Sequence, residues 1–479
     1  MKKLLASLLV ISACGSPSVV VGVKEDTTTT TKSETMKVDS EIITALNNAS
    51  DEAKNCIKDK WPNGVEHVLG GHIPSENETN LIYSCINDPE GMKQNDTESL
   101  DKDNKAEPLD KDNKEEPLGG DSGWKSQWKG KCEGTGTVMF ANSPMKIEDI
   151  HSLSPYGQIV GGHVTPIDHM YFEPKERSLG RDAYEVRAIQ DAYIFQISVR
   201  EVGAESQERQ EPDFRLDMVH TCTFGSYFDL MTSLSTELEA IWNKGNFSGT
   251  SVKAGQLLGY VGAQTLDFGV YNYAEPLDFI NPEAYNREPW KIYTHDPFPY
   301  FPLEIRDKLL NKMIRKVEPR IGRINYDVDG TLSGNWFEVG TNFYNGVDKS
   351  KYWDGHFSLS LDPIDPSFWQ IGIGFLNTEY NNFIIQGSPD PLGVTVEHGK
   401  QIYELFMGGT YIVNNPDKKW WEAPYDENDT YGVRLDRESQ GRYIMLELLE
   451  TRLLQLEVFS NVNKNSITEF TKESRLYER

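Results

Sequence analysis

The sequence predicts a mainly β protein in which two β-rich domains follow a small helical module. From about residue 125, short β-branched and aromatic runs alternate with Gly, Pro and Asn/Asp turns, a pattern typical of all-β proteins. Before this region, residues 41–87 carry apolar side chains at helical spacing, and residues 88–124 form a charged repeat. The 479 residues of the chain are enough for two to four domains.

The first residues, MKKLLASLLVISAC, have the pattern of a lipoprotein-type export signal. Two lysines precede an apolar run at 4–11 that is too short to span a bilayer as a mature helix. Small residues before Cys14 are typical of a site where the signal is cut and the cysteine acylated; a plain secretory signal with a chance cysteine is the alternative. We predict a signal at 1–14, a flexible tether at 15–40, and an exported protein facing the periplasm or the cell exterior.

The acidity of the chain argues against two classes of partner. Its formal net charge is -26, which repels nucleic acid and anionic lipid headgroups. We therefore expect no nucleic-acid partner. We also expect contact with the membrane only through the N-terminal lipid.

The chain contains five cysteines, an odd number that the signal explains. If Cys14 carries lipid, Cys56, Cys85, Cys132 and Cys222 remain, and export permits disulfides between them. One sequence does not fix the connectivity. We predict Cys56–Cys85 as a staple within the helical module, which is too small to bury much apolar area, and Cys132–Cys222 in the central domain.

The linker predicted at 88–124 contains a direct repeat, LDKDNKAEP followed by LDKDNKEEP. Its mixed charges, prolines and near absence of aromatic residues favour a solvated spacer. A calcium loop is the weaker alternative, because the glycine and distal glutamate of an EF-hand are missing.

Two β-rich domains are predicted, at 125–304 and 319–465, with a helical connector at 305–318 between them. Within the first, apolar residues at helical spacing predict a helix over 226–243. The second closes with a hairpin whose strands meet near residues 450–452. Its tryptophans, Trp336, Trp353, Trp369, Trp420 and Trp421, fit either an aromatic core or a face that stacks on sugar rings.

The stretch GGHVTPIDHMYF (161–172) holds two histidines and an aspartate within seven residues. His163, Asp168 and His169 are residue types that bind transition metals. The alternative is an ordinary turn that leads into a strand. In an extended strand Asp168 and His169 would point to opposite faces, so we do not expect both to bind one ion.

The segment VKAGQLLGYVG (252–262) reads as a strand, a glycine corner and a second strand. With the ordered pieces GHVTPID, AIQDAYIFQI, VHTCT and TLDFGVY, it resembles the lysostaphin-type (LytM-like) zinc endopeptidases over residues about 130–300. Biotinyl and lipoyl carrier domains have a similar corner. The resemblance implies a β-sandwich and a zinc site, with Asp168 in the place of the family's aspartate ligand.

The sequence departs from the family pattern at two places. His163 lies five residues before Asp168 instead of four, and the family's His-x-His is replaced by Thr265-Leu266-Asp267. The resemblance therefore implies His163, Asp168 and Asp267 as metal ligands, with His220 as base or orienter. Zinc is the implied metal, and a carboxylate-rich set leaves manganese or calcium as rivals.

Threonine cannot act as a general base near neutral pH, and this decides our interpretation. We predict a degenerate peptidase-type domain that binds a peptide or glycan of the cell envelope. The alternative is an active metal-dependent endopeptidase that cleaves cell-wall peptides. A purely structural envelope protein is a third possibility.

Overall fold

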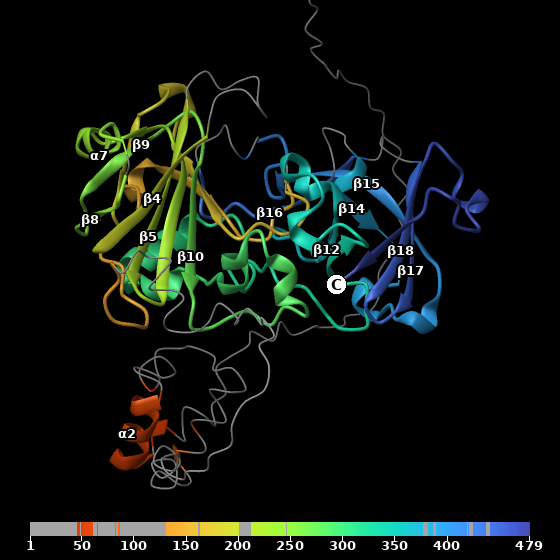
Figure 1. Cartoon of the computed structure of the whole chain (residues 1–479), viewed down its shortest axis with the longest axis horizontal. Helices are drawn as coiled ribbons and strands as arrows, with labels where there is room; N and C mark the ends of the chain where they lie inside the picture. The colour runs from red at the N-terminus through yellow and green to blue at the C-terminus, as the bar shows by residue number, and fades with distance from the viewer. Residues whose placement is uncertain are drawn as a thin grey trace, which may run out of the picture. The chain divides into compact units, whose positions relative to one another are not determined.

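The chain divides into two compact units, Met1–Asp112 and Asn113–Arg479. The computed structural model describes residues 46–47, 49–60, 65, 82, 85–86, 131–160, 163–200, 212–245, 247–376, 382–386, 389–418, 420, 425–436 and 441–479 (Figure 1). The predicted signal, tether and charged linker lie outside these residues.

The N-terminal unit is helical where it is described. Helix α2 (Asp51–Lys60) follows Ser50, whose hydroxyl accepts a hydrogen bond from Ala53 N. A Cys56–Cys85 disulfide joins this helix to the last described residues of the unit and confirms the predicted pairing. Apolar side chains of Leu46, Ile57 and Ile82 pack around it, so the disulfide lies inside a very small core.

The second unit is mainly β, as predicted, and begins with a seven-stranded antiparallel sheet. Its strand order is β1-β2-β10-β6-β5-β4-β8, and Figure 1 shows β4, β5 and β10 within it. A smaller sheet, β3-β9-β7, contributes to the same hydrophobic core. The strands are β1 (Ile150–Ser154), β2 (Met170–Pro174), β3 (Tyr184–Arg187), β4 (Ala192–Arg200), β5 (Asp213–Thr221), β6 (Phe224–Met231), β7 (Ser233–Leu234), β8 (Thr250–Val252), β9 (Leu257–Val261) and β10 (Leu266–Asn272).

The prediction of a helix over 226–243 is wrong for its first half. Those residues form β6 and β7, and helix α7 spans only Thr236–Trp242. Ser235 caps it by accepting a hydrogen bond from Leu238 N, so the helix begins ten residues later than expected. Strand β6 is buried on both faces, and a continuous apolar run does not distinguish such a strand from a helix.

The glycine corner forms as predicted, between β8 and β9. Gly255 has φ +78°, a conformation that favours glycine. A Cβ at Gly259 would overlap the carbonyl oxygen of Ser233, and one at Gly262 would overlap that of Gly180. These two positions therefore allow the backbone of the small sheet to approach its neighbours closely.

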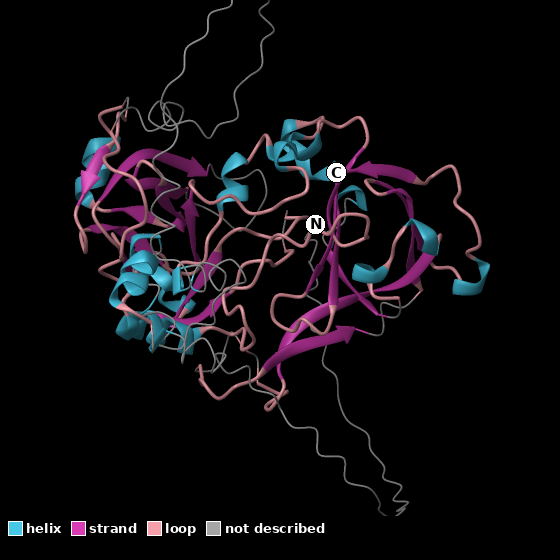
Figure 2. Ribbon diagram, turned by 90° about the horizontal axis from the view of Figure 1, so that it is seen from below, coloured by secondary structure: helices cyan, strands magenta, loops and turns pink. Residues whose placement is uncertain are grey.

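The predicted connector contains helix α8 (Leu303–Lys312), shorter at its C-terminal end than 305–318. A nine-stranded sheet follows, and it closes on itself because β14 pairs with both β13 and β15 (Figure 2). Its strands are β11 (Gly334–Glu338), β12 (His356–Leu361), β13 (Trp369–Ile373), β14 (Asn382–Gln386), β15 (Gln401–Ile412), β16 (Tyr431–Asp436), β17 (Arg442–Glu450), β18 (Leu453–Ser460) and β19 (Arg475–Glu478). Within the described part of the chain, no helix has the length and apolarity needed to cross a membrane.

The C-terminal sheet confirms the closing hairpin and extends past the predicted boundary. Strands β17 and β18 pair in antiparallel register, with Glu450 opposite Leu453. Strand β19 lies between β11 and β18, so the sheet continues beyond residue 465. Trp336 is fully buried in its core, as one of the two aromatic interpretations predicts, and its indole N–H donates to Leu332 O. Trp421 lies outside the described residues.

The C-terminal sheet also holds the loop that leads into β2. Three of its side chains donate hydrogen bonds to carbonyl oxygens of residues 157–164: Ser358 to Val164, Gln370 to Gly157, and Asn382 to Ile159. Gly372 leaves the space that the Val164 carbonyl fills. The second sheet therefore positions the segment that contains His163.

Candidate functional site

The site is built around a loop that is closed at its base. Gly157 N donates to Ile167 O and Ile167 N donates to Gln158 O. The next two residues, Asp168 and His169, form a bend before β2 begins at Met170. Because both residues lie outside the strand, the alternation expected of a strand does not apply to them. Both side chains are buried and in contact, which corrects the prediction that they face opposite ways.

A buried polar cluster forms where this bend meets β10. His169 contacts a carboxylate on each side, with Nδ1 3.4 Å from Asp168 Oδ1 and Nε2 3.4 Å from Asp267 Oδ2. Tyr271 OH donates to Asp168 Oδ2 at 3.2 Å. We refer to Asp168, His169, Asp267, Tyr271 and the nearby Lys291 as the Asp168 cluster.

Lys291 supplies the cluster with a cation that belongs to the protein. It lies in the short 3-10 helix η4 (Pro289–Tyr293), is 1% exposed, and places Nζ 3.8 Å from Asp168 Oδ1. Burial alone would raise the pKa of Asp168. The Lys291 ammonium and His169 outweigh it and hold this pKa well below its usual range. Asp168 is therefore a carboxylate whose charge is already compensated.

Charged side chains continue the cluster across the face of β4, β5 and β6. The guanidinium of Arg215 donates three hydrogen bonds of 2.9–3.2 Å to Asp217 and lies 3.8 Å from the centre of the Tyr227 ring. Arg200 donates to Asp229, and Arg215 Nη1 lies 3.7 Å from the same carboxylate. Residues two apart on a strand share a face, so this pattern is one polar surface of the sheet.

The structure brings three of the four predicted site residues to one region. Asp168 and Asp267 belong to the cluster, and the ring centre of His163 lies 5.8 Å from that of His169. Burial, together with the nearby His169 and Lys291, lowers the pKa of His163 to about 3. It is therefore neutral at physiological pH, next to carboxylates that Lys291 and His169 already contact.

His220 lies elsewhere, among core aromatic residues. Its ring packs against Phe140 and Phe224, and its nitrogens contact Asp191 O at 3.0 Å and Ser226 Oγ at 2.9 Å. Burial lowers its pKa to about 4. These contacts account for both ring nitrogens without the Asp168 cluster, so the geometry gives no support to a role as base or orienter there.

The implied zinc site does not fit this arrangement. Within the described residues, no three His, Cys, Asp or Glu side chains are placed to hold one metal ion. The carboxylate expected to bind the metal, Asp168, instead contacts a lysine, a histidine and a tyrosine hydroxyl. We therefore derive no chemistry through a metal from this geometry.

Asp267 is the member of the cluster with an unsatisfied carboxylate oxygen. Its Oδ1 is buried with no hydrogen-bond partner among the described residues. Burial raises its pKa to about 7, although His169 acts in the opposite direction. Unlike Asp168, this carboxyl group is therefore partly protonated near neutral pH.

The Asp267→Asn substitution tests this pKa. A raised pKa means that the stability linked to the neutral carboxyl is fully present below about pH 4 and is lost as the pH rises toward 7. The amide stays neutral at all pH values. The free energy of unfolding of the variant should therefore equal that of the wild type at pH 4 and be higher by roughly 1–3 kcal/mol at pH 8. Urea unfolding at both pH values measures this difference.

The exposed Asp191, whose pKa the ammonium of Lys253 lowers, is the matched control. Asp191→Asn should show no gain in the free energy of unfolding, relative to the wild type, as the pH rises. An Asp267→Asn protein that is less stable than the wild type at pH 8 would show that the ionised carboxylate is favourably paired in the folded protein, which contradicts a raised pKa.

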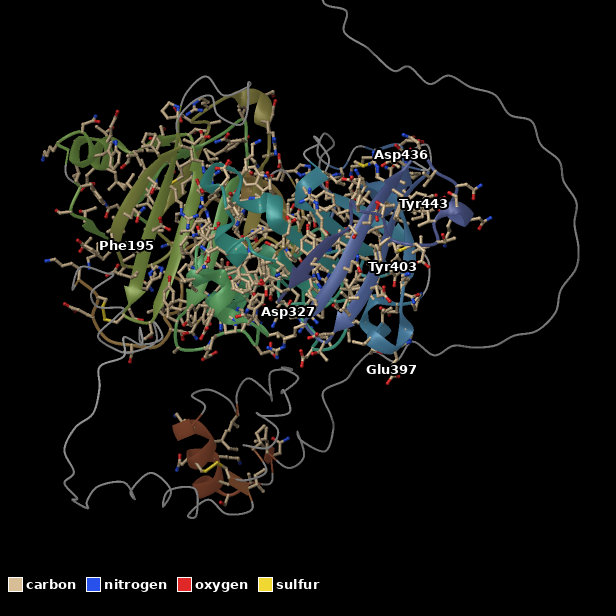
Figure 3. The ribbon with its side chains drawn as sticks, turned by 45° about the vertical axis from the view of Figure 1, so that its right-hand side comes forward. Phe195, Asp327, Glu397, Tyr403, Asp436 and Tyr443 are labelled. Carbon is tan, nitrogen blue, oxygen red and sulfur yellow. A yellow bond between two sulfur atoms is a disulfide. The ribbon has the colours of Figure 1, made fainter. Side chains whose placement is uncertain are left out.

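A cavity of about 300 Å³ opens beside the cluster, on the same sheet. This volume is at the lower end for small-molecule sites. Its lining combines aromatic rings with planar polar side chains: Phe195, Gln196, Ser198, Arg215, Asp217, Met218, Ser226, Tyr271, Tyr273 and Trp290. Figure 3 labels Phe195 on the seven-stranded sheet. We call this cavity the Trp290 pocket.

Sequence reasoning missed the Trp290 pocket and Lys291. We interpreted SYFDLM (226–231) as helix because this strand, buried on both faces, has no clear alternation, and that interpretation hid the shared face of Tyr227 and Asp229. The stretch that holds Trp290 and Lys291 has no periodicity, and its role depends on contacts with the bend before β2 and with β5. No local signal identifies it.

Comparison with known proteins gives little further information. No protein-family model and no curated protein matches the chain. A solved structure from Ruminococcus gnavus, assigned as a glycyl-glycine endopeptidase lytM, is similar to it at 13% identity over 49% of this chain and 80% of that one. The TM-score is 0.17, too low to carry an argument about fold or function.

Proposed function

We propose that this chain is an exported, lipid-anchored protein that binds a peptide or glycan of the cell envelope in the Trp290 pocket without cleaving it. The anchor at Cys14 and the location outside the cytoplasm rest on the sequence of residues 1–14 alone. The binding role rests on the geometry of the site.

One observation carries the proposal: two consecutive residues of η4 serve the site in different ways. Trp290 lines the pocket, while Lys291 reaches the buried carboxylate of Asp168. The ion pair thus fixes the segment that forms the pocket wall. In this interpretation the Lys291 ammonium takes the place of a metal ion, and Asp168, whose charge it compensates, has a structural role.

The proposal is tested by sedimentation of the full chain, purified in detergent, with isolated peptidoglycan sacculi. We expect the wild type to sediment and Trp290→Ala to bind about fivefold to tenfold more weakly, because an aromatic wall is lost. Trp242→Ala is the matched control, since Trp242 is also half-buried but packs on Phe247, away from the pocket. Equal binding by all three proteins, or by none, would contradict the proposal.

Product analysis distinguishes binding from the alternative, metal-dependent cleavage. The soluble fraction after long incubation should contain no newly released peptides by mass spectrometry. Elemental mass spectrometry should find no stoichiometric transition metal in the wild type or in Asp168→Ala. Released peptides together with a metal that Asp168→Ala loses would establish the endopeptidase instead.

A further inference from the structure

We infer that the Trp290 pocket recognises a neutral sugar ring, which stacks on an aromatic wall and is hydrogen-bonded by planar polar side chains. This assignment rests on the proposed function and names the ligand class of the same site. Three properties of the pocket support it: its charge balance, its position in the sheet and the composition of its walls.

The charges of the pocket are already balanced. The Arg215 guanidinium makes hydrogen bonds of 2.9–3.2 Å to Asp217 and lies 3.7 Å from Asp229. An anionic ligand would have to compete with these carboxylates, and a cationic ligand with Arg215 itself. Paired charges that remain partly exposed can still donate and accept hydrogen bonds, so the pocket suits an uncharged ligand with many hydroxyl groups.

The position of the pocket disfavours an extended peptide. Its lining side chains come from four adjacent strands, β4, β5, β6 and β10, so the pocket lies on the face of the sheet; β8 covers the outer side of β4 only at Ala192–Ile194. A peptide that joins a sheet needs the free N–H and C=O groups of an edge strand. A peptide added to the outer side of β4 would lie beside the sheet and not over β5, β6 and β10, so recognition in the pocket depends on side chains.

The walls present flat surfaces of two kinds. Trp290 and Tyr273 are half-buried, which leaves part of each ring accessible to a ligand. A β-bulge between Ile194 and Gln196 interrupts the alternation of β4, so that the consecutive residues Phe195 and Gln196 both line the pocket. An apolar ring face beside an amide and a guanidinium–carboxylate pair matches the apolar C–H face and the hydroxyl edge of a pyranose.

Calorimetric titration of the full chain with three probes tests the ligand class. The probes are tri-N-acetylchitotriose, cellotriose and pentaglycine. We expect at least one sugar to bind and the peptide not to bind. Trp290→Ala should weaken sugar binding about tenfold and Gln196→Ala a few-fold, whereas Trp242→Ala should leave it unchanged.

The salt dependence supplies a second readout. Affinity for a neutral sugar should change less than twofold between 50 and 500 mM NaCl, because no net charge is transferred. If pentaglycine binds and Trp290→Ala abolishes that binding, the ligand class of the pocket is a peptide and not a sugar. Failure of both sugars at millimolar concentration, while sacculi still sediment in a Trp290-dependent way, would overturn the sugar assignment and leave the binding function standing.

Discussion

Replacing Lys291 with methionine should lower the free energy of unfolding at pH 7 by about 3–5 kcal/mol, the usual cost of leaving a buried charge unpaired. Lys291 is 1% exposed, and its Nζ lies 3.8 Å from Asp168 Oδ1. Methionine keeps the length and apolar stem of the side chain but removes its charge. Urea denaturation followed by tryptophan fluorescence measures the loss.

Two variants separate the charge from packing. Asp168→Asn removes the partner, so the double variant Lys291→Met/Asp168→Asn should be more stable than the sum of the two losses predicts. Lys308→Met is the matched control, because Lys308 forms an exposed helical pair with Glu304 and its loss should leave the free energy of unfolding nearly unchanged. Strictly additive losses at residues 291 and 168 would mean that the Lys291 charge acts independently of Asp168, for example over the Tyr344 ring.

The effect of Lys291→Met should also depend on pH in a defined direction. The pKa of Asp168 is lowered in the folded protein, so its stabilising ionisation is present above about pH 4 and lost as the pH falls. The loss caused by Lys291→Met should therefore shrink in acid. This direction is opposite to that of Asp267, whose pKa is raised, so two carboxyl groups that contact the same histidine should give opposite pH profiles.

Removing the Cys132–Cys222 disulfide should have the second largest effect, a loss of about 2–4 kcal/mol in the free energy of unfolding. The bond joins residues 90 apart in sequence and anchors the first described segment of the β unit to the end of β5. Hydrogen bonds from Cys222 N to Gly134 O and from Thr221 Oγ1 to Gly136 O lie beside it. Cys132→Ser/Cys222→Ser, unfolded in urea, tests this prediction.

The other disulfide provides the control. Cys56 and Cys85 lie 29 residues apart in the N-terminal unit, so Cys56→Ser/Cys85→Ser should leave the unfolding transition of the β unit in place. An unchanged free energy of unfolding for Cys132→Ser/Cys222→Ser would mean that the closed loop retains its structure in the denatured state.

Much of the architecture could be predicted because its signals are local. The mainly β class, the corner at Gly255, the final hairpin and both disulfides are confirmed. Turn chemistry and the spacing of apolar residues are properties of neighbours in the chain. The helix expected at 226–243 was wrong because a strand buried on both faces loses the alternation that would identify it.

The sequence by itself determined that His163 and Asp168 lie together just ahead of one strand and that Asp267 belongs to another. Only the tertiary structure decided what surrounds them. It placed Lys291 beside Asp168 across 123 residues of chain, and it packed His220 against Phe140 instead. The physical reason is that a buried charge is compensated by whichever group the packed elements bring within a few ångströms, and that distance is a property of packing between segments far apart in sequence.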